Sequence, residues 1–570
     1  MHNTKSIKSF FLVASFLLST FAQAQGGATA AQANTKDNVE TPQQKEITPS
    51  PAQPSETDIA VPKQQGKASE NKVKASDEAT SDSSKANKDT DTKQDYAFSA
   101  QTVVNIAKEL AKSPMEAPDI APKELTDLDY ATYEKIDFQQ NKAVWGNTPT
   151  PFSIQLFAPG YLYKDLVSID VVENGRAFPL EVSASSFTTP TQKIDDLIAK
   201  AGKYAGLRLH YPLNAPDQND EFIVFQGASY FRAISKGQTY GLSSRGLAIN
   251  VAQPTGEEFP RFKHFWIERP SVTQKAIVVH ALLDSKSVTG AFRFGIYPGS
   301  PTRVDVQATL FPRVDIQHVG LAPLNSMFMY DGTLDHSDRP NYRPELHNSD
   351  GLQIQTGSDE VLWRPLNNPK TLQISAFLDT SPKGFGLIQR DNKFSDYQDL
   401  DADYQDRPSS WIKPLNDWGA GNIELVEIPS NSKSNDNIVA YWEPKDGLKK
   451  DVPYTYSYQL TWPNDTPILA GKPHIVRSAR TVSLPNNNPE VVIDYSNLSV
   501  SDLSKVAVDA SISQGSIIKT RVVQNPNIKG LRVFVTFDTQ EADVAELRVQ
   551  LKENDQPLAS TWLYRWLKQK

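Results

Sequence analysis

The chain contains no cysteine among its 570 residues. It therefore forms no disulfide, zinc–thiolate site or iron–sulfur cluster, and it has no cysteine nucleophile. Disulfides mainly stabilise small exported domains whose hydrophobic cores are insufficient. A chain of this length can bury a large core, so the lack of cysteine is compatible with folding in an oxidising compartment.

Histidine is scarce, with eight residues scattered along the chain. None of them forms a His-x-x-x-His or His-Glu-x-x-His pair, the spacings that place two metal ligands on one helix face. The Gly-x-Ser-x-Gly elbow, the Walker loop and the Gly-x-Gly-x-x-Gly fingerprint are also missing. We therefore expect no metal ion and no organic cofactor, and nothing indicates a serine nucleophile or a nucleotide site.

An excess of basic charge is missing as well, because the formal net charge is −8. A protein that binds nucleic acid needs a basic face, so we expect no nucleic-acid partner. No segment after the amino terminus approaches the length of a transmembrane helix. We therefore expect a mature protein without a stable membrane span.

The amino terminus has the pattern of a secretory signal peptide, residues 1–24. Lys5 and Lys8 precede an apolar run over 10–21, and the small residues Ala22 and Ala24 follow it. The alternative is a retained membrane anchor, but the run is shorter than the roughly 20 residues that a span needs. No twin-arginine pair precedes the run, which indicates the ordinary secretory route and a periplasmic location.

Residues 25–94 are rich in Ala, Gln, Ser, Thr, Lys, Asp and Pro and almost free of aromatic residues. Such a segment buries too little apolar surface to offset its ordering entropy, so we expect it to be disordered. Order is predicted to begin near residue 95. Helices are predicted over 98–112 and 191–201, where apolar residues recur with a helical period.

Most of the remaining chain has the alternating pattern of β-strands bounded by Gly, Pro, Asn and Asp. Clear examples are 152–157, 276–283, 290–297, 302–310, 371–378 and 454–462. We expect residues 95–463 to form a large antiparallel β-sandwich with elaborate loops. After a turn-rich boundary at 463–475, about seven short strands over 475–570 predict a small immunoglobulin-like sandwich.

Chemistry-bearing residues gather in three loop-rich segments, 341–352, 389–411 and 434–442. They combine carboxylates and amides with arginine and aromatic rings. Planar rings stack on sugar faces, while Asp, Asn and Arg bind hydroxyls, so the composition is compatible with a carbohydrate ligand. The alternative is solvated turns, for which Asn-Asp-Asn is a good sequence.

Long stretches from about residue 96 to the carboxyl terminus resemble the family of periplasmic glucan biosynthesis proteins, its G and D types. They read QLFAPGYLY at 155–163, FQGASYFRA at 225–233, YGLSSRGLAI at 240–249, GEEFPRF at 256–262 and WRPLNNP at 363–369. The resemblance implies a galactose-mutarotase-like β-sandwich, an immunoglobulin-like domain and a β-1,2-linked glucan as ligand. The ordinary secretory signal resembles the G type.

Some members of the family resemble inverting glycoside hydrolases or transglycosylases, and this likeness implies two catalytic carboxylates. The acid of the family's Asn-Asp-Asn-Ile-Val-Ala stretch corresponds to Asp436. The base lies in a His-Asp-Ser-Asp-Gly segment, which here has Asn348 at its first Asp position and Asp350 at its second. If the first position is the base, hydrolysis should be impaired. Lys433, where the family often has Glu, would favour the charged form of a nearby acid unless it points into solvent.

We therefore expect an inverting glucanase or transglucosylase in which Asp436 is the acid and Asp350 helps to deprotonate the acceptor. Candidate glucan contacts, each with packing as the alternative, are Tyr230, Arg232, Arg245, Trp363 and Asn367. The rival hypothesis is a non-catalytic glucan-binding scaffold that receives chains from an inner-membrane glucan synthase. Asn348 and Lys433 favour this rival.

Overall fold

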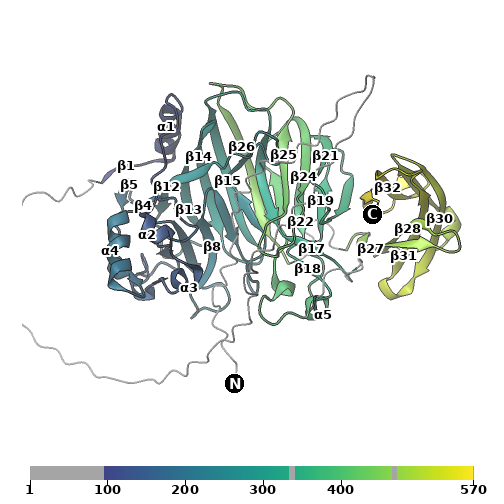
Figure 1. The fold of residues 1–570 in the computed structure, drawn as a ribbon, viewed down its shortest axis with the longest axis horizontal. Coiled ribbons are helices and arrows are strands. Elements are labelled where there is room, and N and C mark those ends of the chain that lie inside the picture. Colours follow the sequence, from purple (N-terminus) through teal and green to yellow (C-terminus); the bar gives the residue numbers. More distant parts are fainter. Residues whose placement is uncertain (1–94, 333–340, 465–470, 569–570) are drawn as a thin grey trace, which may run out of the picture. The chain divides into compact units, whose positions relative to one another are not determined.

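The computed structural model describes residues 95–332, 341–464 and 471–568, and these residues are mainly β (Figure 1). The predicted signal peptide 1–24 and the predicted disordered segment 25–94 lie outside the described residues. Among the residues described, no helix is both long and apolar enough to cross a membrane.

The larger of two main sheets has 16 strands. In spatial order they are β1 (Tyr96–Ala97), β5 (Arg176–Pro179), β4 (Ser168–Glu173), β12 (Arg261–Glu268), β13 (Ile277–Asp284), β14 (Val288–Tyr297), β15 (Thr302–Pro312), β26 (Tyr454–Trp462), β23 (Trp411–Pro414), β22 (Gly384–Ile388), β19 (Gly351–Gln355), β20 (Val361–Pro365), β34 (Thr561–Leu567), β32 (Val544–Glu553) and β29 (Val506–Ile512), with β33 (Gln556–Pro557) paired to β32.

The second main sheet has 10 strands. Their order is β21 (Gln373–Thr380), β24 (Ala420–Glu427), β25 (Ile438–Pro444), β16 (Val319–Ser326), β10 (Ser243–Arg245), β9 (Tyr230–Ala233), β8 (Asp220–Gln226), β7 (Gly206–Tyr211) and β3 (Ser153–Leu156), with β11 (Leu247–Ile249) paired to β16. Two small sheets pair β17 (Phe328–Tyr330) with β18 (Leu346–His347) and β2 (Asp137–Phe138) with β6 (Phe187–Thr188).

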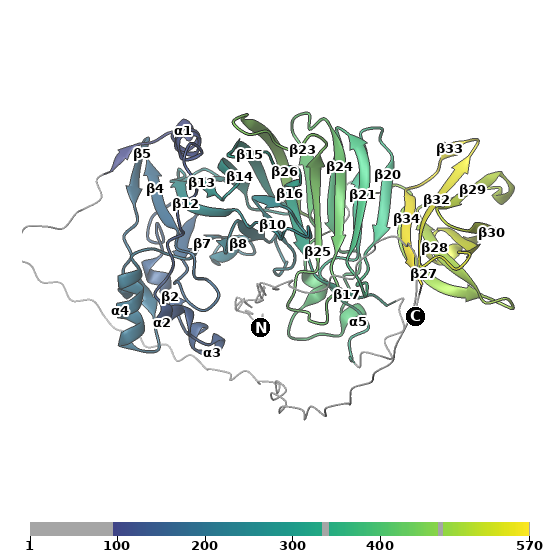
Figure 2. The same ribbon diagram turned by 45° about the horizontal axis from the view of Figure 1, so that its top comes forward.

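Helices are few and mostly short. They are α1 (Ala100–Leu110), α2 (Lys123–Thr126), α3 (Tyr130–Tyr133), α4 (Gln192–Ala201) and α5 (Phe394–Tyr397). Figure 2 shows α2, α3 and α4 grouped near β2. The two predicted helices are confirmed, with ends set by local chemistry: Ser99 and Thr102 form a capping box before α1, and Gly202 ends α4 at φ +65°.

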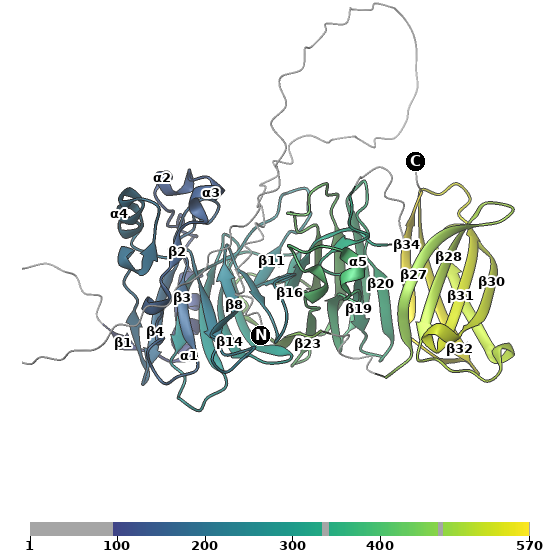
Figure 3. The same ribbon diagram turned by 90° about the horizontal axis from the view of Figure 1, so that it is seen from below.

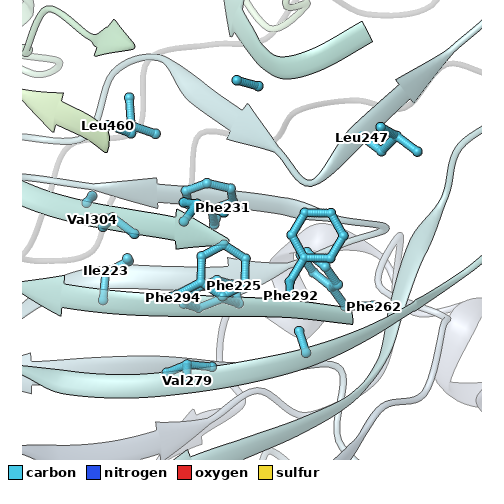
Figure 4. Packing of buried hydrophobic residues seen from close by; sticks show 14 of the residues in the cluster. Ile223, Phe225, Phe231, Leu247, Phe262, Val279, Phe292, Phe294, Val304 and Leu460 are labelled. Carbon is cyan, nitrogen blue, oxygen red and sulfur yellow. The ribbon is translucent and has the colours of Figure 1, made fainter. Parts of the chain in front are cut away.

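Aromatic rings from both main sheets meet in the core between them (Figure 4). Phe292 and Phe294 are two residues apart on β14, so both point to the same face of the larger sheet. Phe225 of β8 and Phe231 of β9, from the second sheet, lie 5.2 Å and 5.4 Å from Phe294 between ring centroids. This packing confirms the predicted large antiparallel β-sandwich. Alternation in the sequence places apolar side chains on the two surfaces that face each other.

The C-terminal residues form a further sandwich. One of its sheets is formed by the last strands of the larger main sheet, β34, β32 and β29. The opposite sheet contains β27 (His474–Ser483), β28 (Asn488–Ser496), β31 (Gly530–Asp538) and β30 (Ser516–Asn525). Figure 3 shows β34 next to β20, and two residues of each strand pair in parallel. Trp363 and Trp411 join the same apolar cluster. The division at 463–475 and the immunoglobulin-like topology therefore stay predictions.

The central aromatic cluster should dominate the stability of the large sandwich. Phe294 is fully buried, so Phe294→Ala removes its transfer free energy and leaves a cavity, at a cost of about 3–5 kcal/mol. Phe394→Ala makes the same chemical change at a site where the ring is 47% exposed, and it should cost far less. Urea unfolding followed by tryptophan fluorescence measures both. Equal losses in the two variants would contradict this assignment of the core.

Candidate functional site

Asp436 lies two residues before β25, and the buried side chain of its neighbour Asn437 holds it there. The Asn437 Oδ1 accepts a hydrogen bond from the Phe328 amide at 2.8 Å, and its Nδ2 donates to the Phe328 carbonyl at 2.9 Å. The same Nδ2 also donates to the Ile428 carbonyl at 3.2 Å. All three contacts are to backbone groups, so the Asn437 side chain fixes the position of the adjoining Asp436.

The second sheet places Arg232 and Tyr230 near Asp436, and Arg245 against Tyr230. Arg232 of β9 lies 3.7 Å from the Asp436 carboxylate, and the Ser243 hydroxyl of β10 donates to it at 3.4 Å. Arg245 of β10 is paired in register with Tyr230 of β9, and its guanidinium lies 5.3 Å from that ring. Burial raises the pKa of Tyr230 to about 12, so its hydroxyl stays protonated at neutral pH.

Arg245 is committed to internal contacts. It is 2% exposed and donates to the Asn325 side chain at 2.9 Å and to Glu257 at 2.5 Å. These partners hold its guanidinium against Tyr230. In contrast, the side chains of Arg232 and Asp436 keep 16% and 13% of their surface exposed. Arg232 and Asp436 are therefore a charged pair that a ligand can reach.

Asp350 lies at the start of β19 and is 3% exposed. Its Oδ1 accepts from the Arg390 amide at 3.1 Å, and its Oδ2 accepts from the Arg390 Nε at 2.7 Å and Nη2 at 2.5 Å. The guanidinium in turn lies 3.9 Å from the Trp363 ring. Both oxygens of Asp350 are thus occupied by one arginine.

Trp363 and Asn367 have internal roles. Trp363 is 2% exposed, and its ring covers Gly351, where an added Cβ would approach the ring to 2.1 Å. The backbone amide of Asn367 donates to Glu427 at 2.7 Å, and Glu427 forms a fully buried ion pair with Arg364 at 3.0 Å. The side-chain Nδ2 of Asn367 is buried and has no hydrogen-bond partner among the residues that the structure describes. Trp363 therefore offers no free face on which a sugar could stack.

The two positions at which the sequence departs from the family pattern differ in environment. Asn348 is fully buried, and its Oδ1 accepts a hydrogen bond from Arg407, whose guanidinium lies 3.9 Å from the Tyr404 ring. Burial lowers the pKa of Arg407. Lys433 is exposed, so water screens its ammonium from Asp436.

Sequence reasoning missed a cluster formed by Glu345, His347 and Asp391. One ligand atom from each of them lies within 4.8 Å of the others. Burial, together with the charges of Asp350 and Glu345, raises the pKa of Asp391 to about 7. Burial is the largest single influence on the pKa of His347 and lowers it. The hydrogen bond to Glu345 and the negative charges of Asp350, Glu345 and Asp391 together outweigh burial, so the net shift is upward. The local signal is only Glu-x-His, and Asp391 is remote in sequence.

This cluster predicts a pH dependence of stability. Asp391 ionises near 3.8 when unfolded but near 7 when folded, so the folded state holds the extra proton and stability falls as the pH rises through this window. The pKa of His347 is also raised in the folded state, so this residue likewise lowers the stability as the pH rises. Asp391→Asn should make the free energy of unfolding fall less steeply with pH. Urea midpoints measured in EDTA between the two pKa values, 3.8 and about 7, test this. Asp401→Asn, at an exposed position, is the control, and an unchanged slope in Asp391→Asn would refute this origin.

The comparisons with known proteins agree with the resemblance seen in the sequence. The model of the family described as periplasmic glucan biosynthesis protein, MdoG, matches residues 98–566. Glucans biosynthesis protein G 2 of Shewanella oneidensis is 61% identical over 476 residues, which cover 84% of this chain and 90% of that protein. Glucans biosynthesis protein G of Vibrio cholerae is 44% identical over 474 residues, covering 82% and 87%.

Similar solved structures are much more distant. The galactose mutarotase related enzyme of Lactobacillus acidophilus is similar with a TM-score of 0.20 and 9% identity, over 43% of this chain and 97% of that one. Paenibacillus xanthan lyase is similar with a TM-score of 0.22 and 10% identity, over 70% and 32%. These low scores carry no argument about the site. The family match and the close relatives are sufficient: the chain belongs to the family of periplasmic glucan biosynthesis proteins.

Proposed function

We propose that this chain acts in the periplasm in the biosynthesis of osmoregulated periplasmic glucans, on their β-1,2-linked glucan backbone. The names of its relatives support a role in glucan biosynthesis. The reaction is that of an inverting glucanase or transglucosylase. The resemblance of the Asp436 and Asp350 segments to those of inverting family members supports this part of the proposal.

The observation that carries the proposal is the accessible pair of Asp436 and Arg232. Inverting cleavage needs a carboxylic acid that can reach the glycosidic oxygen. Asp436 keeps 13% of its side-chain surface exposed, and Asn437 fixes its position. Arg232 presents guanidinium donors suited to sugar hydroxyls. In this mechanism Asp436 protonates the leaving oxygen while Arg232 and Ser243 orient it.

The acceptor side of the reaction is assigned to Asp350. Inverting pairs are usually separated by roughly 6.5–9.5 Å, which leaves room for a water molecule. Asp350 is buried and both of its oxygens are held by Arg390. It would therefore receive the proton through substrate hydroxyls and water rather than by direct contact with the acceptor.

The second candidate function is a glucan-binding scaffold that receives chains from an inner-membrane glucan synthase. The buried pair of Asn348 and Arg407 favours it. If the base belongs at position 348, an amide there cannot accept a proton at neutral pH. The surface around Asp436 and Arg232 would then hold glucan without cleaving it, and the C-terminal sandwich would provide the docking surface.

Replacement of Asp436 separates the two functions. Wild-type protein incubated with linear β-1,2-glucan should shorten or rearrange the chains, and Asp436→Asn should lower this rate by roughly 10²-fold or more because the general acid is lost. Asp446→Asn, in an exposed turn, should behave like wild type. Size-exclusion chromatography of the products gives the readout. Unchanged chain lengths with the wild type and both variants, together with measurable glucan binding, would reject catalysis and leave the scaffold.

Replacement of Asn348 locates the base. Asn348→Asp places a carboxylate against the Arg407 guanidinium, which compensates its charge in the buried site. If position 348 is the base, this variant should cleave β-1,2-glucan at least about tenfold faster than the wild type. If Asp350 is the base, Asp350→Asn should abolish turnover and Asn348→Asp should not raise it. Reducing-end assays on the two variants distinguish these outcomes.

A further inference from the structure

The cluster of Glu345, His347 and Asp391 has the composition of a metal site. His347 belongs to β18, Glu345 directly precedes that strand, and Asp391 follows β22. One nitrogen and two carboxylate oxygens therefore converge within 4.8 Å, from segments that the fold holds rigidly. His347 is fully buried, and the Glu345 side chain is 16% exposed.

The orientation of His347 is set by Gln389. The Gln389 Nε2 donates to the His347 carbonyl at 3.2 Å, so its Oε1 is the atom that faces Nδ1 of the ring, at 2.8 Å. The Tyr397 hydroxyl donates to the Asp391 carbonyl at 2.9 Å, and its oxygen lies 3.4 Å from the same Nδ1. Two acceptors at Nδ1 keep a ring hydrogen there, which leaves Nε2 as the nitrogen that can bind a metal.

Nε2 of His347 faces the cluster and lies 3.1 Å from the Glu345 Oε2. Without a metal, a proton on Nε2 bridges the two atoms, and a bound ion would displace that proton. Two ligands of one tetrahedral Zn²⁺ ion, each roughly 2.0–2.1 Å from the metal, lie roughly 3.3 Å apart. The observed separation is close to that value. A hydrogen bond from the distal ring nitrogen to an amide or carboxylate oxygen is the usual way in which proteins orient a metal-binding histidine.

The nearby arginine does not pair with the carboxylates of the cluster. Arg390 is the nearby guanidinium, and its Nε and Nη2 bind Asp350 while its Nη1 donates to the Ile475 carbonyl at 3.0 Å. Within residues 95–332, 341–464 and 471–568, no lysine or arginine forms an ion pair with Glu345 or Asp391. Arg390 and His347 are the positive charges that act on Asp391, and His347 is the one paired with Glu345.

We propose that Glu345, His347 and Asp391 bind one divalent transition-metal ion of the Zn²⁺ type. A mixed set of imidazole and carboxylate donors suits Zn²⁺ better than Mg²⁺ or Ca²⁺, which prefer oxygen alone. The ion would bridge β18 and the segment after β22, directly beside Asn348. Neither Asp436 nor Arg232 contributes a ligand. The charge of Asp350, however, acts on both Asp391 and His347. Metal binding itself, and not glucan cleavage, is therefore the readout of the test.

Calorimetric titration of the untagged, EDTA-treated chain with Zn²⁺ tests the site. The wild type should bind one equivalent, confirmed by elemental analysis after dialysis, and its thermal midpoint should rise by roughly 3 °C at saturation. Asp391→Asn and His347→Gln should each weaken binding at least about tenfold. His318→Gln is the matched control, because His318 forms an exposed pair with Glu443 at 2.9 Å that lacks a third ligand. It should bind like the wild type.

Two results would overturn the proposal. The first is absence of stoichiometric binding by the wild type, which would leave the cluster as a network that shares protons. The second is equal binding by the wild type, Asp391→Asn and His318→Gln, which would place the ion elsewhere. Circular dichroism shows whether His347→Gln still folds. If His347→Gln is unfolded, the binding measured with Asp391→Asn decides the outcome.

Discussion

The arrangement of the candidate site depends on one buried amide, the side chain of Asn437. Its three hydrogen bonds are made to the backbone of Phe328 and Ile428, so it joins β17 to the loop before β25. β17 in turn pairs with β18, which carries His347. A buried amide is stable only when its partners are present, so this contact specifies one geometry. It connects the Asp436 segment to the segment that contains Asn348 and Asp350, although about ninety residues separate them.

The fold was largely predictable because its determinants are local. Alternating apolar residues mark the strands of both sandwiches, and the predicted ranges 290–297 and 302–310 match β14 and β15 closely. Capping by Ser99 and Gly202 sets the ends of α1 and α4. The pairing of β20 with β34 was not predictable, because it joins remote parts of the chain and involves only two residues of each strand.

The candidate site was predictable only in part. Tyr230, Arg232 and Arg245 lie near one another because β9 and β10 are paired neighbours, and the order β10, β16, β25 brings Asp436 to them. Sequence could not show that Asp350 is bound on both oxygens by Arg390. It also could not show that His347 meets Asp391, since this depends on the packing of β18 against the remote segment after β22.

The central claim is that this family member cleaves or transfers β-1,2-linked glucan by inversion with Asp436 as the acid. Time-resolved proton NMR of β-1,2-glucan incubated with the protein tests it most directly, because it identifies the anomer formed first. Inversion of a β-linkage predicts that the α-anomer appears first, or that an acceptor adds with inverted configuration, in the wild type and not in Asp436→Asn. Release of the β-anomer first, or no new anomeric signal with the wild type, would contradict the account.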